Sequence, residues 1–175
     1  MKYETQHLEG EEVLAIARAA AAAARTAPKA RGIDDILTLV LTGAEKDRLA
    51  DEVLRIGEEK GIGIFVRDSK NLRGAGAVLL VGVRNKVREV PNCGYCGYPD
   101  CTANARAGGV CAMCVTDLGI AVGSAASVAA DRRADTRVMF TIGKAALGMG
   151  LLPDAAAAFA LPFTIAGKNP FFDRK

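Results

Sequence analysis

Clustered cysteines are the residues whose types and spacing best indicate chemistry in this chain. The sequence has five cysteines, all in one segment with the spacing C-x2-C-x4-C-x9-C-x2-C: Cys93, Cys96, Cys101, Cys111 and Cys114. A disulfide framework would spread its cysteines along the chain to staple a small core, whereas grouped thiolates at short spacing suit iron or zinc. The segment therefore predicts a metal centre, and we favour an iron–sulfur cluster.

The residues between the first three cysteines favour a loop that wraps around such a cluster. Gly94 and Gly97 directly follow Cys93 and Cys96, and glycine permits the tight backbone curvature that aims N–H groups at sulfur atoms. A helix is expected to begin near Asp100, where its positive end would offset the negative charge of a cluster. We therefore expect four thiolates that hold a [4Fe-4S] cluster.

Zinc is the main alternative metal, because zinc ribbons also present paired C-x2-C units. Cys101 argues against zinc. A zinc ribbon has no use for a third cysteine only five positions after Cys96, whereas a compact loop with three cysteines is common in iron–sulfur binding. Thiols without a metal, either inert or redox-active, are the third interpretation.

The overall composition excludes several functional classes. The chain has 175 residues, 50% of them hydrophobic, and its 23 basic and 20 acidic residues give a net charge of +3. This balance leaves no basic stripe for nucleic acid, and 5% aromatic residues without tryptophan offer few stacking platforms. A Ser–His–Asp triad is excluded because the one histidine, His7, lies in a polar segment, and no glycine-rich phosphate loop is present.

The N-terminal segment and the apolar runs indicate where the protein resides. Residues 1–12 are polar and acidic, where a secretory signal peptide would be basic and then apolar. Charged residues, glycine or proline interrupt the apolar runs before they reach the roughly 18 uncharged residues that a membrane helix requires. We therefore expect a cytoplasmic protein that does not associate with a membrane.

Alternating helix and strand patterns predict a single domain over residues 1–175. Helices are expected at 11–25, from 43 to about 61, at 117–130 and at 143–150. Strands are expected at 36–41, 64–66, 77–83 and 136–142, while 155–160 fits either a helix or a strand and 67–76 fits a connector or a single helical turn. These elements predict an α+β or α/β fold, with a central mixed sheet of about five strands covered by helices. The cysteine-rich iron–sulfur loop, residues 91–116, is expected as an insertion in this fold.

The cysteine motif resembles a known cluster-binding module. The string Cys93-Gly-x-Cys96-Gly-x-x-x-Cys101, followed by a helix and a later cysteine, is similar to the four-iron cluster module of the Rnf electron-transport B subunit and of corrinoid iron–sulfur proteins. The resemblance implies that Cys93, Cys96 and Cys101 are cluster ligands. The chain departs from that module in the fourth cysteine, which the module places farther on.

A wider resemblance extends over nearly the whole chain. Several strings look like those of an uncharacterised prokaryotic family that contains a ferredoxin domain and has no established activity: Thr26-Ala-Pro28, Asn92-Cys-Gly-Tyr-Cys-Gly97, Cys111-Ala-Met113, Asp117-Leu-Gly-Ile-Ala-Val-Gly-Ser124, Ile142-Gly-Lys-Ala-Ala146 and Gly167-Lys-Asn169. This resemblance favours Cys111 as the fourth ligand, because Cys111 precedes Ala112-Met113 as the later cysteine of the family does. Cys114 is then the alternate ligand, a spare thiol or a small buried hydrophobic residue.

Two other segments resemble parts of the nitroreductase fold, which carries FMN. They are the alanine-rich helix that runs into residues 25–32, and the helix at 142–150 with the Leu-Leu-Pro string that follows it. The resemblance implies that residues 153–163 form a strand in spite of their alanine content, and that Lys29 and Arg31 could meet a flavin phosphate. The alternative interpretation of Lys29 and Arg31 is a solvated turn after a helix.

Three more residues near the cysteines have two interpretations each. Tyr95 and Tyr98 could shield a cluster from water or serve as ordinary packing residues. Asp117 could orient a loop near the cluster, although we favour the interpretation that it caps the following helix.

Three functions fit these observations. The first is electron transfer, in which a ferredoxin-like module passes single electrons to a protein redox partner. The second is an FMN-dependent, nitroreductase-like oxidoreductase with an auxiliary cluster. The third is a non-catalytic binding or scaffold module with a structural metal. Because nitroreductase-like proteins are dimers, the resemblance is also compatible with a homodimer.

Overall fold

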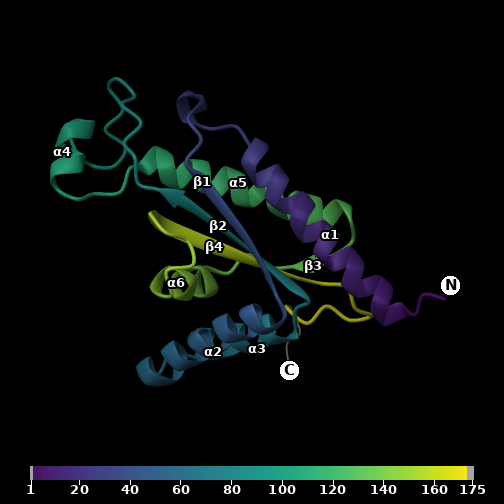
Figure 1. The fold of residues 1–175 in the computed structure, drawn as a ribbon. Coiled ribbons are helices and arrows are strands. Elements are labelled where there is room, and N and C mark those ends of the chain that lie inside the picture. Colours follow the sequence, from purple (N-terminus) through teal and green to yellow (C-terminus); the bar gives the residue numbers. More distant parts are fainter. Residues whose placement is uncertain (1, 173–175) are drawn as a thin grey trace.

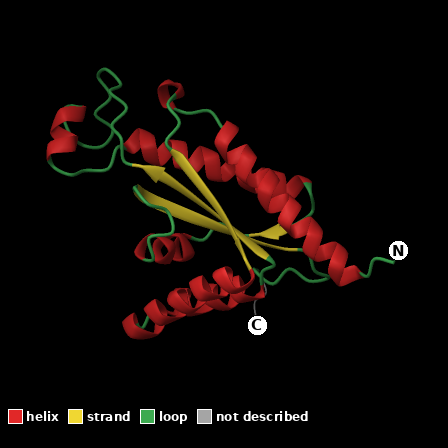
Figure 2. Ribbon diagram, in the orientation of Figure 1, coloured by secondary structure: helices red, strands yellow, loops and turns green. Residues whose placement is uncertain are grey.

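The computed structural model of the chain describes residues 2–172. Within these residues, four strands form one antiparallel sheet in the order β1-β2-β4-β3 (Figure 2). The strands are β1 (Ile36–Thr42), β2 (Ala77–Arg84), β3 (Asp135–Thr136) and β4 (Ala155–Thr164). The helices are α1 (Thr5–Thr26), α2 (Gly43–Lys60), α3 (Gly63–Gly74), α4 (Cys101–Arg106), α5 (Ala112–Asp131) and α6 (Phe140–Gly148), and the short 3-10 helix η1 (Ala30–Gly32) follows α1.

Strand β2 connects the two halves of the hydrophobic core, because successive side chains of a strand point to opposite faces of the sheet. Leu79 and Val81 belong to the core layer of α1 and α5, whereas Val78 and Leu80 belong to the layer of α2, α3 and α6. Figure 1 shows these two groups of helices on opposite sides of the sheet. Residues 77–83 are accordingly all buried.

Small side chains allow α1 and α5 to pack closely in the first of these layers. Half of the buried residues of the two helices are alanines: Ala17, Ala20 and Ala24 of α1 and Ala121, Ala125 and Ala129 of α5. The hydroxyl of Ser124 also donates a hydrogen bond of 3.0 Å to the carbonyl of Ala23, across the two helices. The buried alanines of these helices therefore serve helix packing, as the sequence indicated, whereas Gly119 and Gly123 of α5 are exposed and face open space.

Helix α5 is the one helix among residues 2–172 that is long and apolar enough, by length and composition, to cross a membrane. Its side chains Leu118, Ala121, Ala125 and Ala129 lie fully buried in the core layer with α1 and β2. Packing inside the fold accounts for the apolar residues on this face of the helix, whereas Val115 and Ile120 are exposed.

The structure corrects two expectations between residues 64 and 76. The predicted strand at 64–66 belongs to a helix, α3, which also includes residues 67–74 of the segment expected as a connector or a single helical turn. The buried residues of α3 recur at helical spacing: Phe65, Asp68, Ser69 and Leu72. Two of them are polar, and Asp68 accepts a hydrogen bond of 2.6 Å from the hydroxyl of Thr141 on α6. A hydrophobic pattern alone therefore misses the helix.

The predicted strand at 136–142 is also wrong over most of its length. Only Asp135–Thr136 forms a strand, and α6 begins at Phe140. Residues 155–160 are part of strand β4, which pairs with β2 on one side and β3 on the other, so the strand implied by the nitroreductase resemblance is present. The α+β class is confirmed, but the sheet has four antiparallel strands in place of the expected mixed sheet of about five.

Candidate metal centre

The cysteine-rich segment connects the end of β2 to the start of α5. Figure 1 shows this connection, with α4 inside it, beyond the end of the sheet and next to the N-terminal end of α5. Gly94 and Gly97 adopt left-handed backbone angles, with φ of 60° and 81°, which glycine reaches without strain. Asp100 begins α4 as predicted, because its carboxylate accepts a hydrogen bond of 2.8 Å from the backbone N–H of Ala103.

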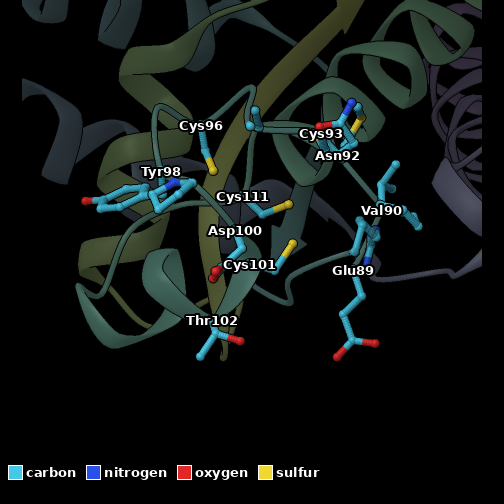
Figure 3. Close-up of a pocket in the computed structure, with 16 residues that line it drawn as sticks. Glu89, Val90, Asn92, Cys93, Cys96, Tyr98, Asp100, Cys101, Thr102 and Cys111 are labelled. Atoms are coloured by element: carbon cyan, nitrogen blue, oxygen red, sulfur yellow. The ribbon is translucent and has the colours of Figure 1, made fainter.

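Four of the five cysteines line one cavity of about 340 Å³. They are Cys93, Cys96, Cys101 and Cys111. Figure 3 shows the sulfur atoms of Cys96, Cys101 and Cys111 directed toward a common space. Apolar side chains complete part of the wall: Val90, Pro91, Pro99, Ala112 and Met113. The fold thus brings together three cysteines of the loop and the cysteine that precedes α5.

The thiols line the cavity without meeting at one point. Among residues 2–172, no three His, Cys, Asp or Glu side chains meet as the ligands of one metal ion. A zinc ion needs four ligands within about 2.3 Å of a single point, whereas each thiolate of a [4Fe-4S] cluster binds a different iron atom, so the ligands stand around a space. Whether these thiols hold a cluster or zinc stays a prediction.

Cys111 and Cys114 lie in different environments although they are three residues apart. Burial alone would raise the pKa of the Cys111 thiol, but hydrogen bonds to its sulfur from the backbone N–H groups of Cys114, Arg88 and Met113 lower that pKa. Cys114 is fully buried, does not line the cavity, and donates its S–H to the carbonyl of Lys86 at 2.7 Å. Burial raises the pKa of the Cys114 thiol to about 11. The structure therefore favours Cys111 as the fourth ligand, an assignment that stays a prediction.

A buried ion-pair network adjoins the cavity. Sequence reasoning missed its central residue, Arg88, which is among the residues that line the cavity. The Arg88 side chain is only 1% exposed. Its Nε and Nη2 donate to Oδ2 of Asp117 at 3.2 and 3.1 Å, and its Nη1 donates to Asp35. Burial would raise the pKa of the Asp35 carboxyl, but hydrogen bonding and charge from Arg88, with a smaller effect of Lys86, lower it. The network joins the base of the cysteine loop to the start of β1 and to α5.

Asp117 has a different role from the one that we favoured. It lies within α5, six residues after the helix N-cap at Cys111, so it does not cap the helix. Its Oδ1 accepts a hydrogen bond of 2.8 Å from the backbone N–H of Ala30, and its Oδ2 accepts from Arg88. Asp117 therefore orients two connecting segments, η1 and the base of the cysteine loop. This agrees with the alternative interpretation, in which Asp117 orients a loop. One signal was in the sequence, because a carboxylate on the buried face of an apolar helix requires a partner.

Arg31 lies beside the base of the cysteine loop, and neither Lys29 nor Arg31 lines its cavity. The ammonium of Lys29 donates to the carbonyls of Arg25 and Ala27 at 2.5 and 2.6 Å, and its side chain is 6% exposed, so Lys29 closes the end of α1 and is not solvated. Arg31 is half exposed and donates to the carbonyl of Arg88 at 3.0 Å. Their role at a flavin phosphate stays a prediction, and Arg31 has the more accessible side chain.

The two tyrosines of the loop differ in exposure. Tyr95 is 79% exposed, so it does not serve as a packing residue. Tyr98 is partly buried and lines the cavity (Figure 3). Of the two, Tyr98 alone has the position needed to shield a cluster.

Comparison with known proteins places the chain in a family. An uncharacterised protein of Archaeoglobus fulgidus is 36% identical over 174 residues, which cover 95% of this chain and 92% of the relative. The sequence profile of the family described as "uncharacterized protein containing a ferredoxin domain", DUF2148, matches residues 107–174. The chain belongs to the DUF2148 family. The family resemblance expected from the sequence is confirmed, while the likeness of the cysteine motif to the Rnf and corrinoid modules stays a prediction.

Solved structures show which fold this DUF2148 protein has. The FMN-dependent nitroreductase NfnB of Mycobacterium smegmatis superposes with a TM-score of 0.60 at 14% identity, over 92% of this chain and 81% of the enzyme. The nitroreductase CinD of Lactococcus lactis, solved with nicotinic acid, gives a TM-score of 0.59 at 18% identity, over 93% and 84% of the two chains. A BluB-like flavoprotein of Clostridium difficile gives 0.56 at 15% identity, over 96% and 85%. The chain therefore has a nitroreductase-like fold, as the weaker resemblance implied.

Proposed function

We propose that this DUF2148 protein is an iron–sulfur electron-transfer protein. In this proposal, Cys93, Cys96, Cys101 and Cys111 hold a [4Fe-4S] cluster, and the protein acts as a ferredoxin-like module in the cytoplasm. The observation that carries the proposal is the single cavity that these four cysteines line while the fifth points elsewhere. The ferredoxin domain in the family description supports the same function.

The residues around the cavity suit this role. A bound cluster of this kind accepts and releases single electrons. Backbone N–H groups of Arg88, Met113 and Cys114 donate to the sulfur of Cys111, and they partly offset negative charge on the thiolate together with the positive end of α5. Tyr98 and Met113 line the cavity and limit water. The exposed Tyr95 leaves the loop accessible from outside, where a protein redox partner could approach.

Anaerobic purification, with iron, sulfide and flavin quantified on one sample, tests the proposal. We expect about four iron and four sulfide per chain, and a broad absorption band at about 400 nm that dithionite bleaches reversibly. A protein purified anaerobically without iron, or one that holds only zinc, would contradict it. A metal that stabilises the fold but shows no reversible reduction would favour the scaffold function instead.

The second candidate is an FMN-dependent, nitroreductase-like oxidoreductase in which the cluster exchanges electrons with a flavin. The fold likeness to FMN-dependent and flavin-containing proteins favours it, and the half-exposed Arg31 would pair with the flavin phosphate. A homodimer belongs to this proposal. Its test is titration of FMN with the anaerobic protein: quenching of flavin fluorescence supports the proposal, and unchanged fluorescence rejects it.

A further inference from the structure

The fifth cysteine, Cys114, has no role in the proposed electron transfer. Its side chain is fully buried and outside the cavity, and four other cysteines satisfy a cluster. Cys114 nevertheless lies three positions after Cys111, at the start of α5. A buried thiol next to a proposed ligand calls for a chemical explanation.

The positions of Cys111 and Cys114 at the start of α5 suit a dithiol pair. Residues three apart at the start of a helix are neighbours, with Cβ atoms about 5–6 Å apart, and disulfides join residues whose Cα atoms are about 4.4–6.8 Å apart. Cys111 is the N-cap, with extended backbone angles of φ −69° and ψ 122°, so its side chain is not held by helical geometry. The two thiols lie close enough to interact with each other.

We propose that Cys111 and Cys114 are a second redox site, which closes to a disulfide when no cluster occupies Cys111. The proposal rests on the proposed function in one respect, since a bound cluster keeps Cys111 out of this reaction. The reaction partner is a low-molecular-weight disulfide, such as glutathione disulfide. It reaches Cys111 through the cavity, which Cys111 lines and Cys114 does not.

This thiol–disulfide exchange needs no oxidant other than the small disulfide itself. The sulfur of Cys111 attacks one sulfur of the reagent, the S–S bond of the reagent breaks, and one thiol molecule leaves. Cys114 then attacks the sulfur of Cys111 in this mixed disulfide, and the second thiol molecule leaves. Two electrons pass from the protein to the reagent, and the two cysteine protons end on the two released thiols. The closed pair removes one ligand, so cluster assembly waits until the disulfide is reduced.

Trypsin separates this pair from the other three cysteines, which makes the test direct. Cleavage after arginine yields residues 89–106, with Cys93, Cys96 and Cys101, and residues 107–132, with Cys111 and Cys114. The full-length chain is freed of iron with a chelator under nitrogen and treated with glutathione disulfide. The remaining free thiols are then blocked with iodoacetamide, the protein is digested with trypsin, and the peptide masses are measured by mass spectrometry. We expect peptide 107–132 to be lighter by two hydrogen atoms and unlabelled, and peptide 89–106 to be alkylated.

Two further samples sharpen the result. In Cys114→Ala, we expect Cys111 to keep one attached glutathione, because the resolving thiol is missing, and Cys114→Ser serves as a second variant if the alanine variant does not fold. In wild-type protein that still holds its cluster, peptide 107–132 should contain no disulfide after the same treatment. Two alkyl groups on peptide 107–132 of the oxidised wild type, or a bond from Cys111 to peptide 89–106, would overturn the proposal. A closed pair in a protein that never binds iron would refute the proposed function and leave the dithiol site intact.

Discussion

The guanidinium of Arg88 donates two hydrogen bonds to one carboxylate oxygen of Asp117, at 3.2 and 3.1 Å, inside the protein. Asp117 is on α5 and Arg88 precedes the cysteine loop, so the pair joins the two segments that supply cavity-lining cysteines. Asp35, next to β1, accepts from the same guanidinium. Arg88 is the largest of the fully buried side chains among residues 2–172. The position of the loop therefore depends on an ion-pair network.

Removal of the guanidinium should strongly destabilise the fold. Arg88→Met leaves two buried carboxylates without their partner, and the loss of one member of a buried network costs about 3–5 kcal/mol. Urea unfolding of the metal-free protein measures the change in the free energy of unfolding. Arg88→Lys, which keeps the charge but not the fork of donors, should lie between the wild type and Arg88→Met. A loss below about 1 kcal/mol for Arg88→Met would mean that the network contributes little.

The same network predicts how stability depends on pH. Because Arg88 lowers the pKa of the Asp35 carboxyl in the folded chain, ionised Asp35 stabilises the fold above its unfolded pKa, and this contribution is lost as pH falls through the folded pKa. Stability of the metal-free protein should therefore decline below about pH 4. Asp35→Asn should be less stable at pH 7 but flatter between about pH 4 and pH 2. Asp131→Asn, at an exposed site, is the matched control and should follow the wild-type curve.

Iron content should separate the two cysteines at the start of α5. Cys111→Ser removes a cavity thiol, so we expect most of the iron and the visible absorption to be lost. Cys114→Ser should keep iron close to the wild-type level, because Cys114 lies outside the cavity. Iron and sulfide assays on anaerobically purified variants provide the measurement, with circular dichroism to show that both variants fold. Equal iron loss in the two variants would require Cys114 in the ligand set.

Close approach of α6 to β4 should make Gly143 intolerant of any side chain. A Cβ atom at Gly143 would lie 2.1 Å from the carbonyl oxygen of Ala158, which requires the helix to move away from the strand. Gly143→Ala should therefore cost at least about 1–3 kcal/mol, the usual range for overpacking. The control is Gly119→Ala on α5, where a Cβ meets open space and better helix propensity should add up to about 1 kcal/mol. Thermal or urea unfolding compares the two, and a neutral Gly143→Ala would contradict the packing.

Local features of the candidate site could be predicted from the sequence. The loop with Gly94 and Gly97 and the start of a helix at Asp100 depend on residues a few positions apart, so glycine spacing and a capping residue were sufficient. Helix α3 could not be predicted in this way, because its buried face contains Asp68, whose partner Thr141 is distant in the chain. Arg88 was missed for the same reason: its partners lie at positions 35 and 117.

The sequence by itself determined that this protein has a cysteine-rich loop suited to a metal and an α+β fold with a sheet covered by helices, because residue spacing limits distance and periodicity limits which faces are buried. Only the tertiary structure decided that Cys111 faces the cavity while Cys114 donates to the carbonyl of Lys86. That choice depends on how the start of α5 is placed against the end of β2. A buried network that spans residues 35, 88 and 117 fixes this placement, and contacts over such separations leave no periodic signal in the chain.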